Sequence, residues 1–508
     1  MTGTRLVRGK WVVTAADSAV AENAAVVVSG GKVDAVLPWT EARRRHPAVE
    51  VIGSERTAVL PGLVNAHHHS HAVTLIQHGL PEKPLEPYLL NFPWIRDYGR
   101  YLDALICGAR LLSTGVTATV DLFSGGGSAE AFADDVRDLI RGYREAGIRA
   151  AVAAGFSMQS FLVYGAGEDE RFIKSLPPEL QADAKSLLPD SVLPEGDYFD
   201  VMADIGRELE GDPNLSLWYA APGPEWVSDA LLQRIAAAAE KADTGVQTHA
   251  VESFLAKVSA HRMYGRSCVR HLDQLGVLSP RFGLAHGVWL DEDEIETLAR
   301  TGASLAHNPG SNLRLFAGIA PVNALRAAGV TVGLGMDANT IDDDEDMFVE
   351  MRLALRLNRE PVFGAPSMTP SDILGLATTG GARLMRRDSS LGRLEPGFAA
   401  DMSVVNLDRV SWPWIAPECD PLSLVVLRAA RQDVDTVLVD GDVVFREGLP
   451  TRFDLPAAVA ELAERVAAAA YPSERAAAAR RLTARLIDWY AAMPTPPLQP
   501  FAAFNSRN

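Results

Sequence analysis

The chain has 508 residues, 47% of them hydrophobic and 22% charged, which is the composition of an ordinary globular protein with enough length for two domains. Its formal net charge of −17 argues against nucleic acid or an anionic membrane surface as a partner, because both prefer a basic face. The sequence has no run of 18 apolar residues and no apolar leader segment, so we expect a cytoplasmic protein.

Both ends of the chain are rich in short β-strand patterns. Residues 1–57 contain several β-rich runs joined by turns, which is too little sequence for an independent β domain. A β pattern returns over residues 393–450, where Asp440 and Gly441 between two apolar runs predict a two-residue hairpin turn. We therefore predict one small β-sandwich, built from 1–57 together with 393–450.

The middle segment, residues 58–392, alternates apolar strand-like runs with helical patterns. Fully apolar strands that alternate with helices indicate a parallel sheet covered on both faces. Eight such units predict an α/β fold of the (β/α)₈ TIM-barrel type as the catalytic domain. The longest insertion, between Phe156 and Leu215, is placed to cover the mouth of the barrel. The eight runs are Ala58–Asn65, Gly115–Leu122, Ile148–Phe156, Leu215–Ala221, Gly245–His249, Phe282–His286, Ala303–His307 and Val330–Met336.

Residues 455–494 are rich in alanine and arginine and have helical periodicity, interrupted at Pro472. This pattern predicts two C-terminal helices, which pack either on the barrel or on a second subunit. A partner-binding role is the less economical interpretation, since alanine-rich tracts form helices by intrinsic propensity.

Polar residues end several of the apolar runs. Functional residues of a parallel barrel gather at the carboxyl ends of its strands. Side chains alternate along a strand, so His67 and His69 point the same way and His68 points away. The fifth, sixth and eighth runs add His249 and Glu252, His286, and Asp337.

Each of these residues has an ordinary structural explanation when it is taken alone. A buried histidine such as His286 is often a satisfied core residue, and Asp337 could be a helix N-cap. His249 and Glu252 could form a pair on a helix surface. Their coincidence at the one barrel face where sites form favours function. The roles of three further histidines stay open between structural and supporting: His68, His71 and His78.

Three neutral imidazoles and one carboxylate suit a single borderline divalent cation, zinc or ferrous iron, with room for a water. The three cysteines are far apart and form no Cys-x-x-Cys pair, so a thiolate site is not indicated. Binuclear hydrolases of this architecture need a bridging ligand, commonly a carboxylated lysine on the fourth strand. Residues 215–226 contain no lysine, so we predict one metal ion. The expected ligands are His67, His69, His249 and Asp337.

A bound metal ion lowers the pKa of its water and makes hydroxide available near neutral pH. Glu252 lies just beyond a strand end and is predicted to protonate the substrate. His286 is predicted to hydrogen-bond the attacking oxygen or the developing charge. Asp337 is predicted both to contact the metal and to accept the water's proton.

Several motifs carry a family resemblance: PGLVNAHHH at 61–69, HAVE at 249–252, LAHGVWL at 284–290, HNPGSNLRLFAGIAPV at 307–322, GLGMDANTIDDDEDMF at 333–348 and GRLEPGFAADMSVVNLD at 392–408. On these motifs the chain resembles the amidohydrolase superfamily. Within it, the chain is similar to the mononuclear aminohydrolase branch of triazine hydrolases, methylthioadenosine/adenosylhomocysteine deaminases, and guanine and 8-oxoguanine deaminases. The resemblance implies the same metal ligands, with Glu252 as proton shuttle and His286 as stabiliser of the attacking oxygen.

The sequence therefore predicts an enzyme, a metal-dependent hydrolase that deaminates an amino-substituted nitrogen heterocycle with a metal-activated water. Two alternatives use the same metal site: removal of chloride or alkylamine, and hydrolysis of a cyclic amide. A third alternative is a non-catalytic scaffold with an amidohydrolase-like fold. Such scaffolds typically lose metal ligands, whereas every expected ligand is present in this sequence.

The expected partner is a small-molecule substrate, with neither nucleic acid nor membrane involved. A planar ring stacks well on tryptophan, although core packing explains the tryptophans of this chain equally well. Family habit and the terminal helices favour a homodimer or a higher homo-oligomer. The candidate substrate contacts are Gln77, Trp94, Trp226 and Asn312.

Overall fold

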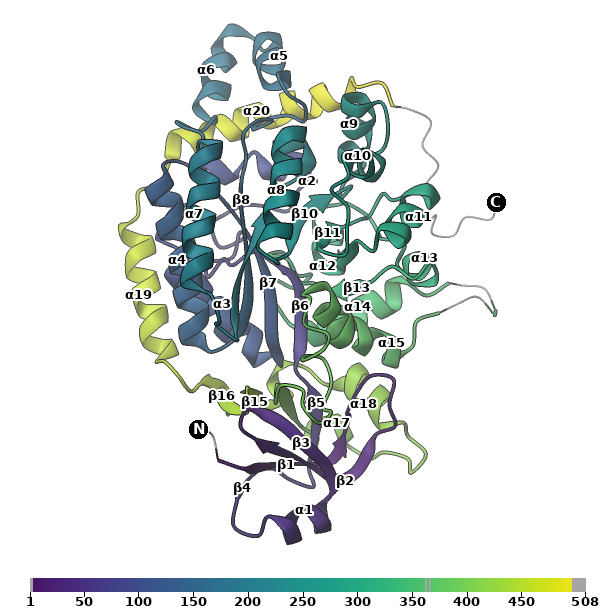
Figure 1. Ribbon diagram of the computed structural model, residues 1–508. Coiled ribbons are helices and arrows are strands. Elements are labelled where there is room, and N and C mark those ends of the chain that lie inside the picture. The colour runs from purple at the N-terminus through teal and green to yellow at the C-terminus, as the bar shows by residue number, and fades with distance from the viewer. Residues whose placement is uncertain (1–2, 361–362, 365–366, 496–508) are drawn as a thin grey trace.

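Figure 1 shows the computed structural model of the chain, in which residues 3–360, 363–364 and 367–495 are described. Its centre is a nearly closed barrel of eight parallel strands, which confirms the predicted (β/α)₈ architecture. The two edge strands meet at the carboxyl end, where the N–H groups of Met336 and Asp337 donate to the carbonyl of His67 at 3.2 and 2.9 Å. The strands are β6 Leu63–His68, β7 Val116–Gly125, β8 Arg149–Phe156, β9 Leu215–Ala220, β10 Val246–Ala250, β11 Phe282–His286, β12 Ser304–His307 and β13 Val332–Leu334.

The barrel strands are apolar because both of their faces are covered. Every residue of β6 and of β8 is buried, between the side chains inside the barrel and the helices outside it. The covering helices begin and end at local signals. In α4 (Ala129–Ala146), the Ser128 side chain accepts the N–H of Ala131, and the helix ends at Gly147 with a φ of 81°.

The first predicted run, residues 58–65, is divided between two sheets. β5 (Thr57–Pro61) pairs with strands from the two chain ends, and β6 begins the barrel. The division lies at Gly62, where a Cβ atom would stand 2.1 Å from Thr117 Oγ1, so that only glycine allows this close approach. One apolar segment therefore contributes to both sheets.

The strands outside the barrel form one nine-stranded sheet from both ends of the chain. The predicted hairpin is present: Val439 pairs with Asp442, and the turn residues Asp440 and Gly441 have φ values of 50° and 72°. Antiparallel pairing of β5 with β14 joins the N-terminal strands to the C-terminal ones. The other strands are β1 Arg5–Val12, β2 Ala21–Ser29, β3 Lys32–Pro38, β4 Glu50–Gly53, β14 Met402–Asn406, β15 Val434–Val439, β16 Asp442–Arg446 and β17 Leu449–Pro450.

The two predicted C-terminal helices form on either side of Pro472, as α19 (Leu455–Ala468) and α20 (Ser473–Ala491). Both pack on their own chain: α19 lies against α3 (Tyr101–Ser113), and α20 crosses the top of the barrel beside α6 (Figure 1). The insertion that follows β8 therefore lies next to the C-terminal helix, over the carboxyl ends of the strands. The insertion contains α5 Glu168–Ser175, α6 Pro178–Ser186 and α7 Glu195–Glu208.

Most of the remaining helices surround the barrel or join it to the sheet of the chain ends, and α1 packs on β2 and β3 of that sheet. Among the described residues, none of the helices is both long enough and apolar enough to cross a bilayer. These helices are α1 Trp39–Arg45, α2 Leu85–Leu89, η1 Phe92–Trp94, η2 Pro224–Trp226, α8 Asp229–Lys241, α9 Phe254–Tyr264, α10 Cys268–Gln274, α11 Glu292–Thr301, α12 Pro309–Arg314, α13 Val322–Ala327, α14 Met347–Leu357, α15 Pro370–Gly375, η3 Leu376–Gly380, α16 Gly381–Leu384, α17 Asp408–Ser411, α18 Pro421–Arg428 and η4 Arg431–Asp433.

A buried arginine joins the barrel to the sheet of the chain ends, and its removal should destabilise the protein. Arg149 on β8 donates to both carboxylate oxygens of Asp401, at 2.7 and 3.0 Å, and also contacts Asp440. Arg149→Met would leave Asp401 buried without its cation, so we expect the free energy of unfolding in urea to fall by about 3–5 kcal/mol. The control is Arg144→Met, which breaks an exposed pair with Asp212 and should cost less than about 1 kcal/mol. Equal losses in the two variants would contradict this role for Arg149.

Candidate metal centre and active site

The structure brings the predicted ligands together at the carboxyl end of the barrel. His67 lies on β6, His69 just beyond it, His249 on β10, and Asp337 on the loop after β13. The Nε2 atoms of His69 and His249 are 3.0 Å apart, and His69 Nε2 is 3.6 Å from Asp337 Oδ1. The His67 ring centroid lies 4.8 Å from that of His69 and 4.9 Å from that of His249. Residues 180 positions apart in the sequence thus converge on one point.

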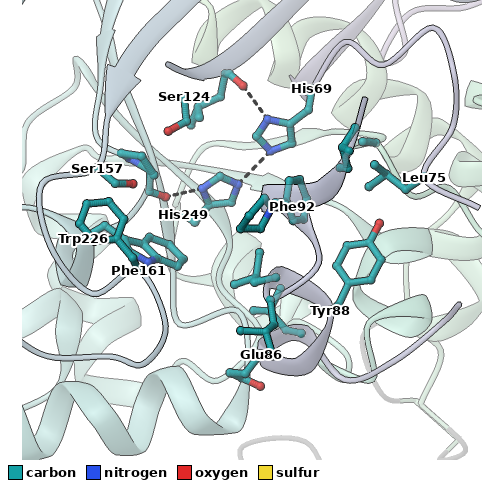
Figure 2. Close-up of a pocket in the computed structure, with 18 of the residues that line it drawn as sticks. His69, Leu75, Glu86, Tyr88, Phe92, Ser124, Ser157, Phe161, Trp226 and His249 are labelled. Atoms are coloured by element: carbon teal, nitrogen blue, oxygen red, sulfur yellow. Dashed lines mark hydrogen bonds between the residues drawn. The ribbon is translucent and has the colours of Figure 1, made fainter. Parts of the chain in front are cut away.

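Backbone carbonyls determine the tautomers of two of these histidines. His69 Nδ1 lies 2.5 Å from the carbonyl oxygen of Leu122, and His249 Nδ1 contacts the carbonyl oxygen of Pro222 (Figure 2). A carbonyl only accepts hydrogen bonds, so each Nδ1 carries the hydrogen and each Nε2 presents a lone pair. Two lone pairs held 3.0 Å apart repel one another unless a cation lies between them.

A glutamine determines the tautomer of the third histidine. Gln247 Nε2 donates to the carbonyl of Ala66 at 2.8 Å, which turns Gln247 Oε1 towards His67 Nδ1 at 2.9 Å. His67 Nδ1 therefore donates, and its Nε2 keeps a free lone pair. That Nε2 is buried, with no hydrogen-bond partner in the described part of the chain. Partners of this kind orient metal-binding imidazoles and raise their basicity.

The charge states of the cluster also suit a cation. Burial and the neighbouring His69 lower the pKa of His67 well below its usual range, and the same two causes lower that of His249 to about 3. Both rings are therefore neutral at physiological pH. Against the effect of burial, the imidazoles of His69 and His286 hold the pKa of Asp337 well below its usual range. Neutral imidazole nitrogens beside an ionised carboxylate are the donors that zinc or ferrous iron prefers, so the residues fit the predicted metal ion.

Glu252 and His286 lie beside this cluster. Glu252 Oε1 is 3.7 Å from His286 Nδ1, and His286 Nε2 is 3.8 Å from Asp337 Oδ2. Burial, and next the negative charge of Asp337, raise the pKa of Glu252 well above its usual range. Glu252 therefore favours its protonated form more strongly than an ordinary carboxyl group does, while Asp337 favours its ionised form. Two carboxyl groups with pKa values shifted in opposite directions in one site are an arrangement suited to acid–base chemistry.

Three residues near these strand ends have an unusual backbone conformation. Val251, His286 and Asp337 have φ values of 43°, 74° and 56°, in the left-handed region that non-glycine residues rarely occupy. Each follows or ends a barrel strand that carries a candidate site residue. Strained residues of this kind persist only where the surrounding structure holds them, and they cluster at functional sites.

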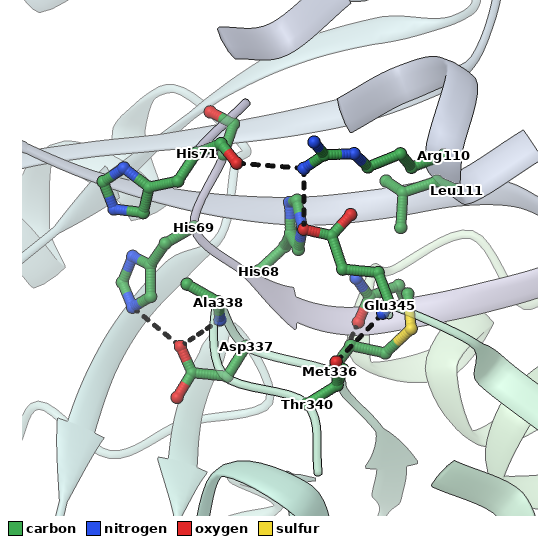
Figure 3. A network of polar contacts seen from close by, with 12 residues as sticks. His68, His69, His71, Arg110, Leu111, Met336, Asp337, Ala338, Thr340 and Glu345 are labelled. Carbon is green, nitrogen blue, oxygen red and sulfur yellow. Dashed lines mark hydrogen bonds and ion pairs between the residues drawn. The ribbon is translucent and has the colours of Figure 1, made fainter. Parts of the chain in front are cut away.

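Two of the three histidines with open roles, His68 and His71, lie near the cluster (Figure 3). His68 points away from the cluster, as the strand alternation predicts, and is fully buried between Asp121 and Glu345 at 4.0 and 3.9 Å. Arg110 approaches Glu345 at 3.7 Å, so His68 belongs to a polar network behind the cluster. His71 lines the cavity described below, and His78 stacks on Tyr98 with ring centroids 6.1 Å apart.

A cavity of about 560 Å³ opens above the cluster, with His69, His249 and Asp337 in its lining. Its walls come from the α2–η1 segment, the insertion and the C-terminal helix, and include several aromatic rings. Figure 2 shows Phe161 and Trp226 on one side of the cavity and Tyr88 on the other. This shape suits a flat ring that is held between aromatic walls with its edge towards the cluster.

The four predicted substrate contacts differ in position. Trp226 lines the cavity, whereas the other three are absent from its lining among the described residues. Trp94 Nε1 donates to Asn91 at 3.1 Å, and Gln77 accepts the N–H of Thr74 at 2.9 Å. Asn312 accepts from His286 Nδ1 at 2.8 Å and so positions that ring.

Other lining residues were not identified from the sequence. Tyr88 and Glu86 lie on α2, in a segment with no periodic pattern, and Phe161 lies in the insertion. No sequence signal marks their orientation. Asn339 follows Asp337 by two residues, so its closeness to a predicted ligand was a signal that could have identified it.

Comparison with known proteins places this site in a family. Residues 58–444 match the model of the Amidohydrolase family. The 5-methylthioadenosine/S-adenosylhomocysteine deaminase of Nitratidesulfovibrio vulgaris is 30% identical over 450 residues, covering 87% of this chain and 92% of that protein. The 8-oxoguanine deaminase of Pseudomonas aeruginosa is 32% identical over 445 residues, covering 86% of this chain and 92% of that protein. The crystal structure of an adenosine deaminase from Xanthomonas campestris with bound zinc is 26% identical, with a TM-score of 0.75, and covers 91% of this chain and 97% of that one.

Metal content tests the cluster directly. His249→Ala removes one of the two converging Nε2 lone pairs, so we expect about one zinc per chain in the unaltered protein and much less in the variant, measured by elemental analysis after purification without chelators. His46→Ala, at the C-terminal end of α1 and away from the barrel, is the matched control and should keep the metal. Two metal ions per chain would contradict the predicted single ion. Full metal content in His249→Ala would contradict the ligand assignment.

Proposed function

The chain belongs to the amidohydrolase family, and on that premise we propose that it is a zinc-dependent hydrolase that deaminates a nitrogen heterocycle. Water adds to the amino-bearing ring carbon, and the amino group leaves as ammonia. The observation that carries this proposal is the convergence of three imidazole lone pairs and an ionised carboxylate beside a protonated glutamic acid. Relatives that are named as deaminases of adenosine derivatives and of 8-oxoguanine support the same reaction.

His67, His69, His249 and Asp337 are the ligands in this proposal. A divalent ion bound there supplies a water of lowered pKa and so a nucleophile near neutral pH. Zinc is favoured over ferrous iron, because zinc is bound in the similar structure from Xanthomonas campestris. Ferrous iron suits the same set of donors.

The remaining residues move protons. Glu252, protonated in its buried position, donates to a ring nitrogen next to the reacting carbon, which makes that carbon more electrophilic. His286 donates through Nδ1 to Asn312, so its Nε2 lone pair accepts a hydrogen bond from the attacking water. Asp337, ionised before the reaction, accepts one proton of the water and passes it to the departing amino group, and the proton of the added hydroxyl returns to Glu252 as the carbonyl forms. Ser311 and the N–H of Ala338 donate to Asp337 at 2.5 and 2.6 Å and hold its carboxylate in place.

The finer properties of the protein are also part of the proposal. Free thiols at Cys107 and Cys268, both buried, support a reducing compartment such as the cytoplasm.

Trp412 and Trp414 are 71% and 74% exposed, and they supply apolar surface that a second copy of the chain would cover. Light scattering of the purified protein tests the expected homo-oligomer.

A substrate screen tests the reaction. The zinc-loaded protein is incubated with 8-oxoguanine, guanine, 5′-methylthioadenosine and adenosine, and both ammonia and the change in ultraviolet absorbance are recorded. Ammonia release in proportion to the loss of an amino heterocycle is the expected result. Chloride or alkylamine release from substituted triazines, with no ammonia from these four compounds, would overturn deamination in favour of another leaving group.

Removal of the proposed acid should stop turnover while the metal stays bound. Glu252→Gln keeps the shape of the side chain but cannot donate the proton, so we expect kcat to fall by about 10²–10⁴-fold. The matched control is Glu225→Gln, since burial also raises the pKa of Glu225, to about 7, although Glu225 does not line the cavity in the described structure. Near-normal kcat in Glu252→Gln, or an equal loss in the control, would contradict the role of Glu252.

A further inference from the structure

One hydrogen-bonding group in the cavity wall has no part in the mechanism above. Asn339 lies two residues after the proposed ligand Asp337 and is only 5% exposed, yet its side chain lines the cavity. The chain after it is firmly anchored. Thr340 Oγ1 accepts the N–H groups of Asp344 and Glu345 at 3.0 and 2.9 Å, and the Thr340 carbonyl accepts from Arg314 at 2.9 Å. Asn339 is thus held at a fixed place between a ligand and an anchored loop.

A tyrosine 251 residues away is hydrogen-bonded to the Asn339 amide. The Tyr88 hydroxyl donates to Asn339 Oδ1 at 2.8 Å. Burial, and next the charge of Asp337, raise the pKa of Tyr88 well above its usual range, so this hydroxyl keeps its hydrogen at all physiological pH values. A free amide can turn to present either a donor or an acceptor. In the orientation observed, Oδ1 accepts from Tyr88 and the NH₂ group is the donor that remains for a ligand.

Among the described residues, the side-chain hydrogen bond found for Asn339 is the one that its Oδ1 accepts from Tyr88, and none is found for its NH₂ group. We propose that Asn339 selects the substrate by donating a hydrogen bond to an acceptor atom on the same heterocycle that is deaminated, with Tyr88 as the residue that positions it. The acceptor is an unprotonated ring nitrogen or an exocyclic oxygen. This inference rests on the proposed function, because it concerns the ring that reacts at the cluster.

Asn339 can discriminate between substrates because its amide group is buried. A substrate with C–H in place of the acceptor, or with an N–H donor there, would leave the amide hydrogens unpaired in a largely apolar cavity. Sites that are built to hydrogen-bond a substrate atom reject analogues without it far more strongly than apolar pockets reject a missing methyl group. Asn339 would therefore distinguish heterocycles that share the same amino-bearing carbon.

The test begins with kcat and KM of zinc-loaded variants on the best substrate of the ammonia screen. We expect Asn339→Ala to lower kcat/KM by about 10–100-fold. Asn339→Asp places a carboxylate acceptor opposite the acceptor atom of the substrate and should lower kcat/KM further. Tyr88→Phe should lower it less than Asn339→Ala does, because the amide remains but can turn.

Two further measurements separate this role from a merely structural one. The double variant Tyr88→Phe, Asn339→Ala should have the kcat/KM of Asn339→Ala within about twofold, since Tyr88 acts through Asn339. The matched control is Tyr98→Phe, which removes the hydroxyl of another buried tyrosine, bonded to Asp103 at 2.8 Å outside the cavity lining. It should leave the selectivity between substrates unchanged. Zinc content and thermal unfolding of every variant show that the site is still folded.

Matched substrates identify the acceptor. For a purine nucleoside, the 3-deaza and 7-deaza analogues each replace one ring nitrogen by C–H, and for 8-oxoguanine, guanine lacks the 8-oxo group. One analogue should be about 10-fold or more poorer than its parent with the unaltered protein, and no poorer with Asn339→Ala. A wild-type preference that persists in Asn339→Ala, or additive losses in the double variant, would overturn the inference. Failure of the unaltered protein to release ammonia from any compound would instead overturn the proposed function.

Discussion

The candidate active site depends on hydrogen bonds made on the far side of each histidine that we propose as a metal ligand. The Leu122 and Pro222 carbonyls and the Gln247 side chain each take the Nδ1 hydrogen of one imidazole. With Nδ1 engaged, every ring presents its Nε2 lone pair to the same point, and the rings cannot turn away. A parallel barrel provides these partners because the carbonyls at the end of one strand face the side chains of the neighbouring strands.

The electrostatic environment then shifts the pKa values of two carboxyl groups, Asp337 and Glu252, in opposite directions. The imidazoles beside Asp337 lower the pKa of its carboxyl group, whereas burial and the charges of neighbouring carboxylates raise the pKa of Glu252. Opposite pKa shifts in neighbouring carboxyl groups provide a base and an acid at one pH. Neutral imidazoles, rather than imidazolium ions, complete the set, because burial and mutual repulsion disfavour their protonation.

The substrate cavity is built differently from the cluster. Its floor belongs to the barrel, but its walls belong to the α2–η1 segment, the insertion after β8 and the C-terminal helix α20. These segments hold one another: the Tyr164 N–H donates to the Tyr490 hydroxyl on α20 at 3.1 Å, and the Tyr164 hydroxyl donates to Glu86 on α2 at 3.2 Å. Regular strands thus position the reacting groups, while less regular segments determine the shape that a substrate must have.

The sequence by itself determined the barrel and the candidate ligands. Apolar runs that alternate with helices indicate a parallel sheet, and a polar residue that ends such a run, as His249 or Asp337 does, marks the carboxyl end of a strand. Both signals are local, so they can be read without knowledge of distant contacts. The hairpin at Asp440 and Gly441 and the break between helices at Pro472 were predictable for the same reason.

Only the tertiary structure decided which other side chains meet at the site. Gln247 with His67 and Tyr88 with Asn339 are pairs of residues 180 and 251 positions apart, and no pattern in the sequence indicates which residue is the partner of which. The division of one apolar run between two sheets at Gly62 depends on the approach of Thr117, which no hydrophobic pattern records. Local patterns report the faces that a segment must bury, whereas orientation and partnership depend on the packing of the whole chain.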